Sequence, residues 1–241
     1  MISQDLIKEL KKYSSPERKK SNEWFFKTGP GQYSEGDKFI GIRVPHIRQV
    51  ARQFLDLSFI EIAKLIKSPI HEIRLAAILI LVERNKQAVK DKDRILQKKI
   101  LDFYLKHRAN VNNWDLVDLS VHRILGQAIL DRLIPKQVLY KYAKSKSLWE
   151  RRFSIITTAM FIHEGKLDDC LKLSKLLLGD KEDLMHKAVG WMLRESWKKD
   201  PARVEKFLIA NYKDLPRTTL RYAIERMAES KRKSFLKGSF K

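Results

Sequence analysis

A cationic residue followed by an apolar, helix-forming segment recurs along this chain at nearly constant spacing. Arg74 precedes LAAILIL, Arg152 precedes FSIITTA, Lys187 precedes AVGWMLR and Arg221 precedes YAIERMA. The steps from Arg152 to Lys187 and from Lys187 to Arg221 are 35 and 34 residues. A period of this length is typical of helix-pair repeats, in which each pair buries its apolar face against its neighbours. We therefore predict a stack of antiparallel helix pairs.

One repeat of this series carries an acid in place of the cation. Arg74 and Arg152 are 78 residues apart, which is two steps of 39, so a further repeat is expected midway. The segment 114–125 (WDLVDLSVHRIL) fills that position and places Asp118 in the cationic slot. From Asp118 the next step, to Arg152, is 34 residues.

Helical periodicity extends through most of the chain, and no sustained period-2 alternation indicates strands. Nine Gly and seven Pro leave few interruptions, and Asp200 followed by Pro201 is typical of a helix start. Three of the glycines lie in residues 28–38 (TGPGQYSEGDK), which we predict to be a surface loop. Helices are predicted over residues 1–12, 70–87, 148–163, 167–178, 181–198 and 201–212.

These elements predict an all-α fold, a HEAT-like or ARM-type helical repeat solenoid. We expect a single domain over residues 1–241. It would comprise N-terminal helices and the glycine-rich loop (1–38), the repeat array (39–230) and a basic tail (231–241). The tail (KRKSFLKGSFK) either adds phosphate contacts or is a frayed, solvated end; chain ends favour the second interpretation.

The charge balance points to a polyanionic partner. Fifty Lys and Arg against 29 Asp and Glu give a formal charge of +21 and a sequence pI of about 10.0. Nucleic acid fits best, because each phosphate contact also releases condensed counterions. The alternative is a soluble protein that simply carries excess lysine. If the stack curves, the repeat-slot cations would line its concave wall as a basic track, or else pair with carboxylates of adjacent repeats; the sequence leaves both open.

Composition excludes several classes of site. Cys170 is the single cysteine, so no cysteine-based zinc or iron–sulfur centre can form, and the six His show no HExxH pairing. There is no P-loop, Rossmann glycine pattern or nucleophile elbow. Residues 1–12 (MISQDLIKELKK) read as a charged amphipathic helix rather than a signal peptide, and no apolar run reaches membrane-spanning length. We expect a reduced cytoplasmic protein without metal, cofactor or membrane partner.

Asp118 is the candidate functional residue of the repeat that carries an acid in place of the cation. A carboxylate weakens phosphate binding, and Trp114 lies four residues earlier, on the same helix face. Asp115 points elsewhere and falls in the first turn behind a predicted Asn113 N-cap, where the helix dipole explains it. The structural alternative for Asp118 is an ion pair with Arg151 or Arg152.

The other tryptophans have a structural alternative too. Trp24, Trp149 and Trp197 can be core or surface aromatics. Trp191 follows Gly190, which leaves space at the backbone, and Arg194 lies three residues later on the same face. Trp191 could therefore pack in the core or serve as a binding platform.

Four short motifs together resemble the AlkD-like family of bacterial DNA alkylation repair glycosylases. They are GIRVPHIRQVA (41–51), NNWDLVD (112–118), LWERR (148–152) and KAVGWMLRE (187–195). Each motif is short, but their order and spacing make the resemblance specific, and it extends from about Trp24 to the C-terminal helix. It implies a C-shaped array of HEAT-like helix pairs whose basic concave face grips duplex DNA.

The resemblance also assigns roles to residues. Asp118 matches the catalytic aspartate, Trp114 and Trp191 match two aromatics that contact the lesion, and Arg152 matches an arginine at the DNA backbone. Phe25 falls near a position where a relative carries tyrosine, and the 28–38 loop is longer than expected. Further backbone contacts are expected from cations of the repeat slots and matched segments, namely Arg48, Arg74, Lys187, Arg194 and Arg221.

The activity that the resemblance implies is excision of N3- and N7-alkylpurines by a monomeric glycosylase associated with the nucleoid. Alkylation makes the base a cationic leaving group, so one aspartate suffices to stabilise the oxocarbenium-like sugar and orient water. Two indoles would favour the cationic base through their π faces. The competing hypotheses are a non-catalytic DNA binder on the same scaffold and an RNA or protein scaffold.

Overall fold

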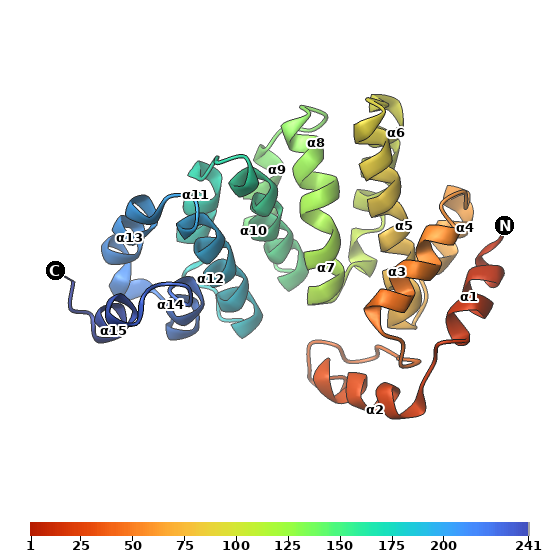
Figure 1. Cartoon of the computed structure of the whole chain (residues 1–241), viewed down its shortest axis with the longest axis horizontal. Coiled ribbons are helices and arrows are strands. Elements are labelled where there is room, and N and C mark those ends of the chain that lie inside the picture. The colour runs from red at the N-terminus through yellow and green to blue at the C-terminus, as the bar shows by residue number, and fades with distance from the viewer. Residues whose placement is uncertain (241) are drawn as a thin grey trace. The chain divides into compact units, whose positions relative to one another are not determined.

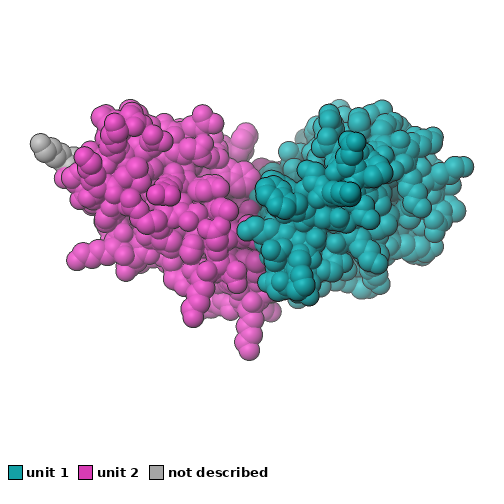
Figure 2. Space-filling view, turned by 90° about the horizontal axis from the view of Figure 1, so that it is seen from below, with its two compact units in different colours: residues 1–124 teal, residues 125–241 magenta. Residues whose placement is uncertain are grey.

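The computed structural model describes residues 1–240, whose backbone consists of helices joined by loops, with one long connection between residues 25 and 44 (Figure 1). Within these residues no strand forms, and one isolated parallel bridge joins Lys38 to Ile70. The chain divides into two compact units, unit 1 (residues 1–124) and unit 2 (residues 125–241), coloured separately in Figure 2. The division falls inside a π-helical turn, His122–Gly126. The assignment of both units to one domain stays a prediction.

Unit 1 is built around one long helix, α5 (His71–Lys90), which is buried over most of its length. All residues of α5 from His71 to Val82 are buried, because this helix packs against α3, α4, α6 and α7. A helix surrounded in this way needs apolar residues on all sides, which explains the run LAAILILV. The helices of this unit are α1 (Ser3–Lys11), α2 (Pro16–Phe25), α3 (Val44–Gln53), α4 (Phe59–Ile66), α5 (His71–Lys90), α6 (Arg94–Lys106) and α7 (Trp114–Val121).

In unit 2 two helices play the same central part. α10 packs against α9, α11 and α12, and α12 packs against α11, α13 and α14. A Cβ atom at Gly190 would lie 2.5 Å from Tyr222 Cβ and 2.6 Å from the Thr219 carbonyl oxygen, so the space beside Trp191 is taken by α14. The helices are α8 (Gln127–Leu130), α9 (Gln137–Ala143), α10 (Leu148–His163), α11 (Asp168–Leu177), α12 (Asp183–Trp197), α13 (Pro201–Ala210), α14 (Arg217–Ala223) and α15 (Glu229–Lys237).

The repeat inferred from spacing has a structural counterpart. The slot residue is the fifth residue of α7, α10, α12 and α14, and the fourth residue of α5. Each slot thus lies in the early turns of its helix, and Asp118 occupies it in α7. The prediction of an all-helical repeat array is confirmed.

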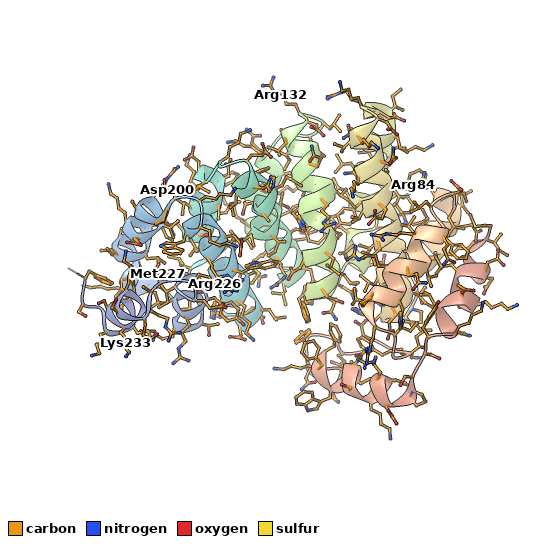
Figure 3. The ribbon with its side chains drawn as sticks, viewed as in Figure 1. Arg84, Arg132, Asp200, Arg226, Met227 and Lys233 are labelled. Atoms are coloured by element: carbon orange, nitrogen blue, oxygen red, sulfur yellow. The ribbon has the colours of Figure 1, made fainter. Side chains whose placement is uncertain are left out.

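Most predicted helix boundaries agree with the structure to within a few residues. The range 148–163 coincides with α10, and Asp200 caps α13 by accepting from the Arg203 amide at 3.1 Å, with Pro201 as the first helical residue (Figure 3). Residues 28–38 contain turns and no helix, as predicted. Within residues 1–240 no helix has both the length and the apolar character needed to cross a bilayer.

The interpretation of residues 231–241 as a frayed tail is wrong for most of the segment. Residues 231–237 belong to α15, and Phe235 is buried. Lys231 Nζ lies 2.9 Å from the Glu205 carboxylate of α13. One apolar anchor and one cross-helix ion pair hold the segment on unit 2. Lys241 lies outside the described residues.

Candidate functional site

The start of α7 brings the candidate residues of unit 1 together. Asn113 caps the helix, as predicted, and its Oδ1 accepts from the Trp114 amide at 2.8 Å. The Asn113 Nδ2 donates to Ser34 Oγ at 2.5 Å and to Asp37 Oδ2 at 3.2 Å, which ties the cap to the 28–38 loop. Trp114 and Asp118 are both partly exposed, one turn apart on the same face.

Trp114 is one member of an aromatic wall formed with Phe25 and Phe26. The Phe26 ring stacks on the indole with centroids 5.4 Å apart and an interplanar angle of 17°. Phe25 meets the indole edge-on at 5.9 Å and is 54% exposed. The structure thus brings together Phe25 and Trp114, two of the three residues predicted to contact the lesion. Phe26 covers one face of the indole, and nothing in the sequence distinguishes Phe26 from its neighbour.

Asp115 has a structural role, and its partner is a buried histidine. The Nε2 of His71, the first residue of α5, lies 2.8 Å from Asp115 Oδ2. Both side chains are almost completely buried. The helix dipole is therefore not the main reason for this acid. Asp118 is the partly exposed carboxylate of α7.

Asp37, His71, Arg74 and Asp115 form one buried charge network. Asp37 Oδ1 accepts from Arg74 Nη2 at 2.6 Å, and its Oδ2 lies 3.3 Å from His71 Nδ1. Burial raises the pKa of Asp37, but the hydrogen bond from His71 and the charge of Arg74 outweigh it and hold that pKa below its usual value. Burial likewise lowers the pKa of His71, but the charge of Asp115 and the hydrogen bonds to both carboxylates raise it to about 9. The network joins two basic side chains to two acidic ones.

A second buried acid fixes the segment that carries the aromatic wall. The Glu72 carboxylate accepts from the backbone amides of residues 40–42, with the shortest bond, 2.8 Å, to Gly41, and from Asn22 Nδ2 at 3.4 Å. Gly41 has φ +78°, and a Cβ there would lie 2.1 Å from the Ser15 carbonyl oxygen. Because every residue of α2 is at least partly exposed, these contacts replace a hydrophobic face in holding α2.

His122 lies one turn beyond Asp118 and was missed by sequence reasoning. Arg123 Nε donates to His122 Nε2 at 3.2 Å. Burial, together with the charge of Arg123, lowers the pKa of His122 to about 4, so the ring is neutral at pH 7. The π-helical turn that begins at His122 is a feature often found at functional sites.

In unit 2 the two arginines of the LWERR motif are engaged in packing contacts. Arg152 is 4% exposed, and its Nη1 donates to the Leu184 carbonyl oxygen at 2.5 Å. Arg151 forms an ion pair with Asp180 at 2.6 Å. Trp191 is partly exposed on α12. Trp114 and Asp118 belong to unit 1, whereas Arg152 and Trp191 belong to unit 2.

The remaining predicted cations differ in depth and in partners. Arg74 is 3% exposed and is bound by Asp37 and by the Ser68 carbonyl oxygen at 3.0 Å, so the structure supports the packing alternative for this slot. Arg221 is exposed. The others have carboxylate partners: Arg48 with Glu83 at 3.9 Å, Lys187 with Asp183 at 2.8 Å, and Arg194 with Glu225 and Glu195.

The fold defines a basic, all-helical repeat protein with an aromatic wall beside a partly exposed aspartate. Residues 6–227 match the family of DNA alkylation repair enzymes, and the chain belongs to that family. A solved structure described as a predicted DNA alkylation repair enzyme from Enterococcus faecalis is similar over 90% of this chain and 97% of that one, with a TM-score of 0.68. At 17% identity this likeness concerns the fold alone. No curated protein matches the sequence.

Proposed function

We propose that this protein is a DNA glycosylase that excises cationic N3- and N7-alkylpurines from duplex DNA. Membership of a DNA alkylation repair family supports alkylated DNA as the target. The observation that carries the proposal is the arrangement on α7. The partly exposed Asp118 follows Trp114 by one helical turn, and the Trp114 ring contacts the ring of Phe25. A carboxylate and a π surface are the two groups that stabilise positive charge on a sugar and on a base.

In this reaction the protein mainly has to stabilise positive charge and orient a water molecule. An alkylated N3 or N7 gives the purine a positive charge, so the base leaves as a neutral molecule without a general acid. Positive charge then develops on the sugar, and the Asp118 carboxylate stabilises that charge more in the transition state than in the ground state. The same carboxylate orients the water that attacks the anomeric carbon.

The aromatic residues provide selectivity for a cationic base. One indole face of Trp114 is covered by Phe26, so we assign the opposite face, with the exposed Phe25 beside it, to the lesion. By resemblance we also assign Trp191 to the lesion. The resemblance places Arg152 at the DNA backbone, but its 4% exposure and its bond to the Leu184 carbonyl oxygen favour the packing alternative for this slot. Exposed cations of the repeats would provide the remaining phosphate contacts, as the charge of +21 favours.

The proposal is tested by single-turnover base release from duplexes that carry one N7-methylguanine or one N3-methyladenine. Release by the wild-type protein well above spontaneous depurination, and none from an undamaged duplex, is the expected result. Binding to these duplexes without release of either base would instead support the alternative, a non-catalytic DNA-binding member of the family.

We further predict that Arg221, the exposed cation of a repeat slot, contacts a DNA phosphate. Arg221→Ala is expected to make the slope of log K against log salt shallower by about 0.9, because one counterion-releasing contact is lost. Duplex affinity measured by fluorescence anisotropy at several salt concentrations checks this. Lys175→Ala, which removes an exposed cation of α11 outside the slots, is the matched control and is expected to leave the slope unchanged. Equal slopes for wild type and Arg221→Ala would remove Arg221 from the DNA contacts.

A further inference from the structure

His71 is held from two sides by carboxylates that come from different segments of unit 1. Its Nδ1 lies 3.3 Å from Asp37 of the 28–38 loop, and its Nε2 lies 2.8 Å from Asp115 of α7. An ionised carboxylate only accepts hydrogen bonds, so both ring nitrogens must carry a proton to satisfy both partners. The imidazolium is thus a charged bridge between the loop and α7, and it is 2% exposed.

The groups around His71 are balanced only when it is charged. Asp37 faces it from the loop, Asp115 from α7 and Arg74 from its own helix, and the rings of Phe26 and Phe39 lie beside it. Loss of the His71 proton would leave two buried carboxylates with one guanidinium, and an uncompensated buried charge is strongly unfavourable.

Two routes connect this bridge to Trp114. The first is covalent, because Asp115 follows Trp114 in the chain and the preceding residue, Asn113, donates to Asp37. The second is a continuous stack of rings. His71 lies on Phe39 with centroids 4.8 Å apart, Phe39 on Phe26 at 5.0 Å, and Phe26 on Trp114 at 5.4 Å. A change at His71 therefore reaches both the backbone and the covered face of the indole.

We propose that His71 is a positioning residue that fixes the plane of the Trp114 indole, by bridging the 28–38 loop to the first turn of α7. The positioning itself is a property of unit 1. Its consequence for base excision rests on the function proposed above, so the two are tested by separate measurements.

The first measurement is the emission of Trp114, isolated as the difference between the wild-type protein and Trp114→Phe from pH 7 to pH 10. Because the pKa of His71 is raised to about 9, the bridge is intact at pH 7 and is lost as the pH rises through about 9. We expect the Trp114 difference spectrum to change with a midpoint near pH 9, and the change to be absent in His71→Gln. A difference spectrum that is constant across this range, while far-UV circular dichroism stays native, would overturn the proposal whether or not the protein is a glycosylase.

The second measurement separates positioning from general stability. His71→Gln is expected to slow single-turnover base release by about 10- to 100-fold, because small misplacements of a contacting group are costly, while duplex affinity changes by less than about threefold. Arg84→Gln is the matched control: Arg84 is a cation of the same helix that donates to the Leu57 carbonyl oxygen at 3.0 Å and lies over Phe59 (Figure 3). This control should keep both the release rate and the Trp114 emission. Equal slowing by both variants would show that His71 has only a structural role. If His71→Gln does not fold, the pH dependence of the Trp114 emission tests the proposal by itself.

Discussion

Asp118→Asn is expected to slow single-turnover release of N7-methylguanine by about 10²- to 10³-fold, while duplex binding changes little. The amide keeps the size and the shape of the side chain but loses the charge that stabilises the oxocarbenium-like sugar. Removal of one preorganised charge-stabilising group from an active site costs about this much. Because the lost interaction is made in the transition state, the loss falls on the rate and leaves the affinity nearly unchanged.

Asp102→Asn is the control for the change in overall charge. Asp102 is an exposed acid of α6, paired with Lys98 at 2.6 Å, and its substitution alters the net charge of unit 1 by the same amount. This control should release the base at the wild-type rate. If Asp118→Asn instead lost stability and duplex binding together with base release, Asp118 would belong to the fold as an ion-pair partner, which is the alternative that the sequence left open.

The repeat and the helices could be predicted because local sequence decides them. The spacing of cations and apolar runs marked the slot positions of α10, α12 and α14, and an Asp–Pro pair marked the start of α13. Each signal lies within one helix and its cap, where propensity, capping and periodicity act together. Asp118 stood out for the same reason, since it breaks a pattern that is visible along the chain.

The buried charge network could not be predicted, because it depends on residues far apart in sequence. His71 meets Asp37 across 34 positions and Asp115 across 44. Nothing local distinguishes these acids from surface acids. The burial of the repeat-slot residues could not be predicted either. Arg74 is buried whereas Arg221 is exposed, although both are arginines at equivalent slots of the repeat. The helix 229–237 was missed because its anchor, Phe235, binds through tertiary packing rather than through helix propensity.

Glu72→Ala is expected to lower the free energy of unfolding of unit 1 by about 3–5 kcal/mol. The carboxylate accepts hydrogen bonds from the backbone amides of residues 40–42 and from Asn22. Alanine leaves these donors without an acceptor, and each buried donor left unsatisfied costs about 1–3 kcal/mol. Glu72→Gln is the conservative control, because its Oε1 can still accept from Gly41 and its neighbours. The smaller cost of this control reports the loss of charge together with the loss of the bond from the Ile40 amide to the second carboxylate oxygen.

The loss is expected to appear first as local opening rather than as global unfolding. All residues of α2 are at least partly exposed, so little apolar burial holds this helix once Glu72 is gone. Hydrogen exchange in Glu72→Ala should therefore accelerate more over residues 15–42 than over α5 and α6. Opening of this segment carries Phe26 away from Trp114, so base release should fall together with the protection of residues 15–42. Unchanged exchange in that segment would mean that the Gly41 contact and the ring stack hold α2 without Glu72, and the aromatic wall would then be independent of this buried acid.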